Sequence, residues 1–184
     1  MDEVLKNVAR NDKTDISVVV NKAGKLTNIN KQEAKNTPPV QHDGGFVLTR
    51  EGSKDFGEIS PEIAQQIRRQ AGKIRLREGE QDGKPGDYGE KHIERKGRMQ
   101  ELLSNGYENA RDFVQDVASG YTAIYGGESG RIILYKKMEK KGASLFIELM
   151  PSLEDDFYDV KTGMITRDTF YKNKKPLWVK PQSG

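Results

Sequence analysis

The residue types best suited to chemistry in this chain are gathered around His92. Arg95 and Lys96 follow the histidine by three and four positions, so on a helix the three side chains share one face. An imidazole can donate or accept a proton near neutral pH, and two fixed cations beside it would attract and stabilise a phosphodiester. The chain has no cysteine, which excludes thiol nucleophiles and leaves His92 as the leading acid–base candidate.

Alternative chemistries have weaker support in the sequence. His92 combined with Glu90 or Glu94 matches no recognised metal-ligand spacing. The chain contains neither the GxxxxGKS/T phosphate loop nor the GxSxG nucleophile motif. The remaining candidates for a hard cation are acids of one turn-like segment, where carboxylates are commonly solvated: Asp155, Asp156 and Asp159. We therefore predict that the protein uses no metal ion and no other cofactor.

The composition limits the size and the surroundings of the fold. The chain has 184 residues, of which 32% are charged and 34% are hydrophobic, and this balance supports one modest core with a less ordered tail. The N-terminal residues lack an apolar secretory run, and no stretch approaches the roughly 20 apolar residues that span a bilayer. Since the chain also has no cysteine, we expect a protein without membrane segments in a cytoplasmic setting.

The distribution of charge is more informative than the net charge of +3. Residues 68–98 carry ten basic side chains against six acidic ones, and residues 161–180 carry six against one. Between these segments, residues 148–160 carry five acids and no base. The pattern indicates a polarised surface with a polyanionic partner, and an ordinary solvated surface is the alternative.

The sequence predicts an N-terminal arm followed by one domain. Alternating apolar residues ahead of a glycine turn predict a short hairpin within residues 15–29. Residues 30–45, which include His42, are polar and rich in proline and glycine, as is typical of a linker. We therefore expect a partly ordered arm over residues 1–57 and an α+β domain over residues 58–184.

Three helices are predicted in the first half of the domain. Ser60 followed by proline is a helix-start signature, and the helical spacing of apolar residues then continues to Gly72. A second helix is predicted over residues 89–104 and carries the histidine. A third is predicted over residues 108–119, with Asn109 as its N-cap.

From Tyr121 onward the pattern changes to short strands. Four segments combine apolar alternation with turn-like links, and short links between successive strands require antiparallel pairing. The segments are residues 122–127, 131–138, 144–150 and 157–165. The predicted architecture is therefore N-terminal helices packed on one face of a four- to five-stranded antiparallel meander, with the other face free to bind a ligand.

The free face of this sheet is predicted to be basic, aromatic and rich in hydroxyl groups. Such a surface can hold phosphates and stack bases. RNA cleavage requires little more, because its own 2′-OH attacks the adjacent phosphate once a base removes the proton and a cation stabilises the phosphorane. The outward residues expected on this face are Arg131, Tyr135, Lys137, Lys161, Thr162 and Thr166.

Several segments together resemble a known family. The pieces are AQQIRRQAGKIRLREGEQDGKPGDYGEKHIERKG, NGYENARDFVQDVASGYTAIY, the FIEL strand, DDFYDVKTG and the closing YKNKKPLWV. In this order they resemble the phage-encoded barnase/EndoU/colicin/RelE-like nuclease domains of phage and prophage polyproteins and polymorphic toxins. The resemblance covers roughly residues 58–180. It implies a microbial-RNase-like fold and a metal-independent endoribonuclease, with tRNA as one class of substrate.

The resemblance also implies roles for individual residues. The motif histidine falls on His92, the strand-borne hydroxyl falls on Thr162, and the motif's basic residues fall on Arg75, Arg95 and Lys96. Family members often carry a second histidine after the basic pair, whereas here Lys96 runs directly into glycine. If that second imidazole shares the proton transfers, this copy of the domain would be slow or inactive.

The predicted partner is RNA, with a cognate immunity or antitoxin protein if the chain is a toxin or phage effector. The predicted RNA contacts outside the catalytic group (His92, Arg75, Arg95 and Thr162) are Lys96, Arg131, Tyr135, Lys161, Lys172, Lys174 and Lys175. One alternative is a non-catalytic module that binds RNA or an immunity protein on the same fold. Another is a phage structural protein with the N-terminal arm as a docking segment.

Overall fold

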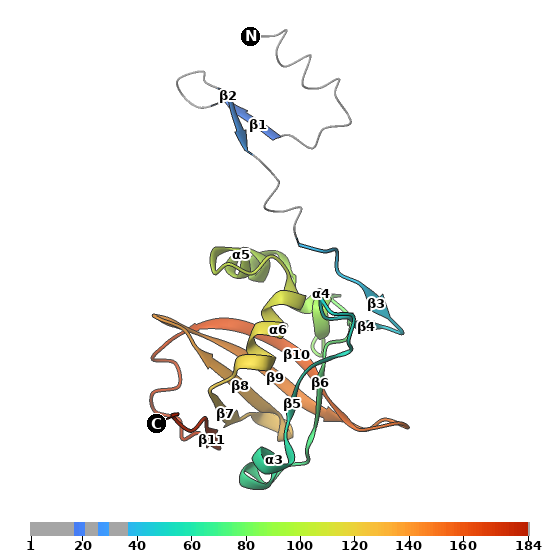
Figure 1. Cartoon of the computed structure of the whole chain (residues 1–184), viewed down its shortest axis with the longest axis vertical. Coiled ribbons are helices and arrows are strands. Elements are labelled where there is room, and N and C mark those ends of the chain that lie inside the picture. The colour runs from blue at the N-terminus through green and yellow to red at the C-terminus, as the bar shows by residue number, and fades with distance from the viewer. Residues whose placement is uncertain (1–16, 21–25, 30–36, 184) are drawn as a thin grey trace. The chain divides into compact units, whose positions relative to one another are not determined.

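The computed structural model describes residues 17–20, 26–29 and 37–183. It divides the chain into two units, Met1–Pro39 and Val40–Gly184. In the first unit β1 (Ser17–Val20) and β2 (Leu26–Ile29) pair antiparallel, with Ser17 opposite Ile29, which confirms the predicted hairpin (Figure 1). The second unit begins at Val40 and therefore includes residues that the sequence reading placed in the arm.

Seven strands of the described residues form the main sheet, in the order β11-β7-β8-β9-β10-β6-β5. Their bounds are β5 (Asp55–Ile59), β6 (Gly72–Arg75), β7 (Ala123–Gly126), β8 (Ile132–Lys137), β9 (Lys141–Met150), β10 (Phe157–Arg167) and β11 (Trp178–Val179). A separate two-stranded hairpin joins β3 (His42–Asp43) to β4 (Phe46–Val47). The four strands predicted after Tyr121 are β7 to β10, and they form the expected antiparallel meander.

The sheet is mixed, so the prediction of a purely antiparallel sheet is wrong. β6 pairs parallel to β10, with Ile74 opposite Tyr158, and β5 then pairs antiparallel to β6. Parallel neighbours need a long crossover connection, and here all residues between β6 and β10, helices included, provide it. The α+β class is confirmed, but two strands from before the meander extend it.

The first predicted helix is shorter than the sequence pattern indicates, the second is divided in two, and the third forms close to its predicted range. The helices are α3 (Pro61–Ile67), α4 (Gly89–Ile93), α5 (Lys96–Ser104) and α6 (Ala110–Gly120), with a 3₁₀ turn η1 (Glu128–Gly130). Ser60 caps α3 as predicted, but the left-handed Arg68 (φ 54°) ends that helix before Gly72, which instead opens β6. None of the helices in the described ranges has the length and the apolar run that crossing a bilayer requires.

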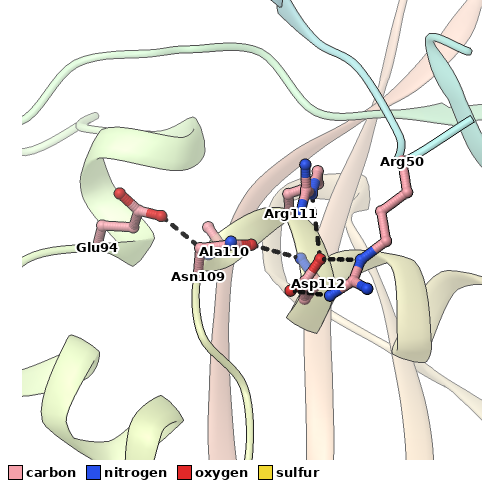
Figure 2. Close-up of polar contacts among 6 residues, drawn as sticks. All are labelled: Arg50, Glu94, Asn109, Ala110, Arg111 and Asp112. Atoms are coloured by element: carbon pink, nitrogen blue, oxygen red, sulfur yellow. Dashed lines mark hydrogen bonds and ion pairs between the residues drawn. The ribbon is translucent and has the colours of Figure 1, made fainter. Parts of the chain in front are cut away.

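The helix predicted over residues 89–104 is broken in two. Arg95 has a non-helical backbone (ψ 150°), and Gly97, which lowers helix propensity, lies in the first turn of α5. Figure 2 shows how the break is tied to the start of α6: the Glu94 carboxylate accepts a hydrogen bond from the Ala110 amide at 2.9 Å. This bond connects the end of α4 to the first turn of α6.

The same helix start is stabilised from two further sides. The Asn109 side chain accepts a hydrogen bond from the Asp112 amide at 2.9 Å, which confirms the predicted cap. Asp112 in turn accepts two hydrogen bonds from Arg50, at 3.0 and 2.7 Å (Figure 2). The first turn of α6 therefore anchors both the α4–α5 break and the segment after β4.

Strand register assigns each side chain to one of two faces of the sheet, because paired residues point to the same side. Ile124, Leu134 and Leu145 follow one another across β7, β8 and β9, and they are buried in the core that includes Phe113 and Val117 of α6. Figure 1 shows α6 lying across the sheet. The opposite side, which we call the second face, carries side chains that alternate with these core residues, including Tyr125, Tyr135, Ser144, Phe146, Thr162, Asp159 and Arg75.

Candidate nucleic-acid interface

The predicted site residues lie in three places of the compact unit. His92, Arg95 and Lys96 lie on α4, at the break and at the start of α5. Arg75, Arg131, Lys161 and Thr162 lie on or beside the strands of the second face. Tyr135 lies on β8, and Lys172, Lys174 and Lys175 follow β10.

His92 is half-buried, and its ring is already oriented. Its Nδ1 lies 2.7 Å from Oε1 of Gln81. With an amide oxygen facing Nδ1, the ring proton of the neutral form belongs on that nitrogen, and Nε2 keeps its lone pair. Burial, followed by the neighbouring charge of Arg95, lowers the pKa of His92 below its ordinary value of 6.5. The ring is therefore neutral at pH 7 and suited to accept a proton.

Arg95 lies beside His92, although not in the helical arrangement predicted from spacing. Arg95 donates a hydrogen bond from Nη1 to the His92 carbonyl oxygen at 2.6 Å. Arg98, which the sequence reading did not single out, also lowers the pKa of His92. The helix break places Lys96 at the exposed first position of α5. The Asp87 charge opposes both arginines, and Arg98 is paired with Glu101 at 2.6 Å, so Arg95 is the main cation acting on the ring.

A second group of charges lies on the second face, and the sequence reading found only one member of it. Arg77 and Lys161 both bind Oδ2 of Asp159, at 2.6 and 2.8 Å. The ring of Tyr88 lies against the same two cations, with its centroid 4.3 Å from the Arg77 guanidinium and 4.8 Å from Nζ of Lys161. We call these four residues the cation cluster.

The cation cluster carries more positive than negative charge and retains unused hydrogen-bonding capacity. Two cations share one carboxylate that is 0% exposed. The hydrogen bond that Arg77 donates to Asp159 raises the pKa of Arg77. Oδ1 of Asp159 and Nε of Arg77 are buried and have no hydrogen-bond partner among the described residues. Buried polar groups without partners are uncommon, and such groups occur where water or a ligand completes the network.

Other predicted cations of the second face are neutralised by acids. Arg75 pairs with Asp55 at 2.7 Å, and Arg131 pairs with Glu148 at 3.2 Å. Thr162 lies opposite Phe146 in the register of β9 and β10. The acidic segment 148–160 therefore contacts both basic segments on this face. Its Asp159 binds Arg77 of residues 68–98 and Lys161 of residues 161–180.

The loop between β6 and α4 brings the imidazole and the cation cluster to the same end of β6. Glu80 and Tyr88 exchange two backbone hydrogen bonds, at 3.0 and 3.2 Å, and the Glu90 amide donates to the Arg77 carbonyl oxygen at 3.0 Å. Gly79 makes this close approach possible, since a Cβ there would lie 1.9 Å from the Tyr88 carbonyl oxygen. Tyr88 of the cluster thus immediately precedes the helix that carries His92.

The other histidine of the chain makes a short side-chain contact with Glu90 that the sequence reading missed. Nε2 of His42 lies 2.6 Å from Oε2 of Glu90. Glu90 is buried on α4, and burial raises its pKa while the hydrogen bond from His42 opposes that shift. His42 lies in the hairpin formed by β3 and β4. The sequence contains a signal for its turn, because Gly44-Gly45 between two short segments favours a tight turn with two positive φ angles.

The predicted aromatic contact, Tyr135, lies in a packed cluster of tyrosines. It is only 7% exposed, with its ring 5.1 Å from that of Tyr171, which stacks on Tyr125 at 4.4 Å. The Tyr171 hydroxyl lies 3.0 Å from Oγ of Ser144. Lys174 lies over the Tyr171 ring, and within the part of the chain that the structure describes, the exposed Lys172 and Lys175 have no acidic partner.

The arrangement offers a neutral imidazole, fixed cations at the same end of β6 and a tyrosine cluster on the same sheet face as those cations. No group of three or more histidine, aspartate or glutamate side chains that could hold a metal ion occurs among residues 37–183. Comparison of the chain with known protein families, with curated proteins and with solved structures gives no match in any of the three.

Proposed function

We propose that this protein is a metal-independent endoribonuclease that uses His92 as its general base. The observation that carries the proposal is the oriented, neutral imidazole beside Arg95, on a helix whose preceding residue, Tyr88, belongs to the cation cluster. A base with its pKa near or below neutrality works without a metal ion at physiological pH. Fixed cations are the usual means of stabilising a phosphorane.

The proposed reaction is an intramolecular transesterification of RNA. Nε2 of His92 takes the proton of a ribose 2′-OH, and O2′ then attacks the adjacent phosphorus. The bond from phosphorus to O5′ breaks, and the leaving oxygen takes a proton from water or from the imidazolium. The products are a 2′,3′-cyclic phosphate and a 5′-hydroxyl end. Arg77 and Lys161 of the cation cluster would stabilise the charge on the phosphorane.

The other predicted residues take supporting roles in this proposal. Arg95 keeps the imidazole neutral and adds positive potential, and the Thr162 hydroxyl on the second face would orient the scissile group. The exposed lysines Lys96, Lys172 and Lys175 would contact the RNA backbone. We further propose that the fold is a variant of the microbial-RNase type in which β6 and β5 extend the meander, and that the protein acts as a phage or prophage toxin in the host cytoplasm.

The test is incubation of the purified chain with total tRNA in EDTA, followed by analysis of the fragment ends. We expect fragments with 2′,3′-cyclic phosphate ends from the parent protein. A folded His92→Ala variant should cut about 10² to 10⁴ times more slowly, the usual contribution of a general base. His42→Gln, which alters the other histidine, is the matched control and should keep cutting. Equal cutting by parent and His92→Ala would exclude the mechanism.

A non-catalytic module that binds RNA or an immunity protein is the second candidate. It is favoured by the state of the second imidazole, because the chain has two histidines and Nε2 of the other, His42, is engaged by the Glu90 carboxylate. A single base without a paired acid supports slower proton transfer to the leaving group. This candidate predicts salt-sensitive RNA binding without cyclic phosphate products.

A further inference from the structure

A pocket of about 660 Å³ lies on the second face at the β7–β8 side of the sheet. This volume is within the range of roughly 300–1,000 Å³ typical of small-molecule sites. Residues 179–183 line it together with side chains of β7 and β8 and their neighbours. The lining residues that matter for recognition are Thr122, Tyr125, Tyr135, Lys137 and Lys180.

The aromatic lining of the pocket is held in a fixed arrangement. Tyr125 stacks on Tyr171 with an interplanar angle of 18° and meets Tyr135 edge to face at 6.1 Å. Tyr171 is itself buried and bonded to Ser144. Tyr125 remains half-buried, so part of its side chain is accessible. A tyrosine fixed in this way loses little conformational entropy when a planar group binds against it.

The pocket differs from the rest of the second face because its cations are unpaired. Lys137 and Lys180 are exposed, and neither forms an ion pair with any acid among the described residues. By contrast, Arg75, Arg131 and Lys161 each bind a carboxylate. Two free ammonium groups beside a tyrosine platform match a ligand that combines a planar ring with a phosphate.

The register of the sheet places this pocket on the same face as the cation cluster. Tyr135 lies opposite Ser144, Ser144 lies opposite Met164, and the same face continues through Asp159 to Arg75. From β7 to β6 there are four strand spacings, about 19 Å along the sheet at roughly 4.8 Å per strand. A nucleotide in the pocket would therefore be separated along the RNA chain from the nucleotide at the cleavage position.

We propose that this pocket binds one nucleotide unit of single-stranded RNA, with the base against Tyr125 and a phosphate at Lys137 and Lys180. This inference rests on the proposed function in one respect, namely that the nucleotide belongs to the RNA that the cation cluster and His92 cleave. Gln182 and Ser183 also line the pocket, and in this proposal their polar side chains would contact the sugar or the base edge.

The test measures binding of 5′-AMP to the full chain by isothermal titration calorimetry. Ribose 5-phosphate, which lacks the base, and adenosine, which lacks the phosphate, should each bind at least about fivefold more weakly, since one stacked base is worth roughly 1–3 kcal/mol. Tyr125→Leu should weaken 5′-AMP binding by about the same factor, and Lys137→Ala combined with Lys180→Ala by about tenfold. Lys140→Ala, which removes an exposed lysine outside the pocket, is the matched control.

The competing outcomes can be told apart. Equal affinity for 5′-AMP and ribose 5-phosphate, or unchanged affinity in the folded lysine double variant, would overturn the site. A 2′-O-methyl hexanucleotide, which cannot be cleaved through its 2′ oxygen, should displace 5′-AMP, and its failure to do so would overturn the assignment to RNA. If 5′-AMP and the hexanucleotide bind as stated but tRNA is not cut, the pocket stands and the ribonuclease proposal fails. If tRNA is cut but 5′-AMP does not bind, the ribonuclease proposal stands and the pocket assignment fails.

Discussion

The cation cluster and the pocket lie on one sheet face but carry their positive charge in opposite ways. Arg77 and Lys161 are fixed by a fully buried carboxylate and by the Tyr88 ring, whereas Lys137 and Lys180 extend unpaired from an open pocket. Charges held in place before a ligand arrives can stabilise a transition state without reorganising. Exposed, unpaired lysines instead favour backbone binding that salt readily screens. We infer a division between chemistry and binding on this face.

The largest effect is expected from Asp159→Ala in the cation cluster. Removing this carboxylate leaves Arg77 and Lys161 unpaired, and breaking a buried ion pair costs about 3 kcal/mol or more. Denaturant unfolding measures the loss. Glu148→Ala, which breaks the exposed pair with Arg131, is the matched control and should cost less than about 1 kcal/mol. Equal losses in the two variants would remove the distinction between a fixed cluster and an ordinary charged surface.

The pH dependence of cutting distinguishes a general base from a purely electrostatic site. His92 must be deprotonated to act as the base, and its pKa lies below 6.5. We therefore expect kcat/KM to rise about tenfold per pH unit while the histidine is protonated. The midpoint of the rise should lie at a pH below about 6.5, and the rate should be constant at higher pH. Arg95→Gln removes a charge that lowers this pKa, so the midpoint should move to higher pH. A rate that falls as the pH rises through this range would assign His92 as the acid instead.

The proposed role of His92 depends on α4 being held in place. Variants of Glu94 and Asn109 test this dependence. Both side chains accept a hydrogen bond from the first turn of α6, but only Glu94 belongs to the segment that carries His92. Each alanine variant should lose about 1 kcal/mol of stability, the usual value of a cap. Cutting should fall in Glu94→Ala and remain unchanged in Asn109→Ala, measured at a temperature where both are folded. Equal rates in both variants would show that the bond does not position the histidine.

The smallest effect concerns the salt dependence of RNA binding. Each phosphate contact on single strands contributes about −0.7 to the slope of log K against log salt concentration. Because both lysines are proposed to contact one phosphate, Lys137→Ala combined with Lys180→Ala should reduce the slope by about that amount. Lys73→Ala should not, because Lys73 already pairs with Glu58 at 2.7 Å. Fluorescence anisotropy with the 2′-O-methyl hexanucleotide at several salt concentrations measures the slopes, and unchanged slopes would place the phosphates elsewhere.

Local signals were enough to predict much of the fold. Apolar alternation located the strands β7 to β10, and the side chains at positions 60 and 109 located two helix starts because an N-cap satisfies amides of its own helix. The parallel pairing of β6 with β10 was not predictable in this way. It joins segments far apart in sequence, and neither strand carries a local signal for its partner or direction.

The candidate site shows the same limit. His92 and Arg95 were identified from residue type and short spacing, and the structure keeps them in contact. Asp159 was interpreted as part of a solvated acidic turn. It lies inside an alternating strand, however, and its side chain points to the second face while that of the next residue, Val160, points to the core. Its burial depends on Arg77, which lies 82 positions earlier, and only the folded sheet brings the two together.

The long separation between the halves of the cation cluster has a consequence for the timing of synthesis. A ribosome releases β6 early, but the strand that completes the cluster is made only after the helices and the rest of the meander. Non-local strand pairs of this kind also form slowly. A nascent or prematurely terminated chain would therefore lack the paired cations, so the activity that we propose would arise only after almost the whole domain has emerged.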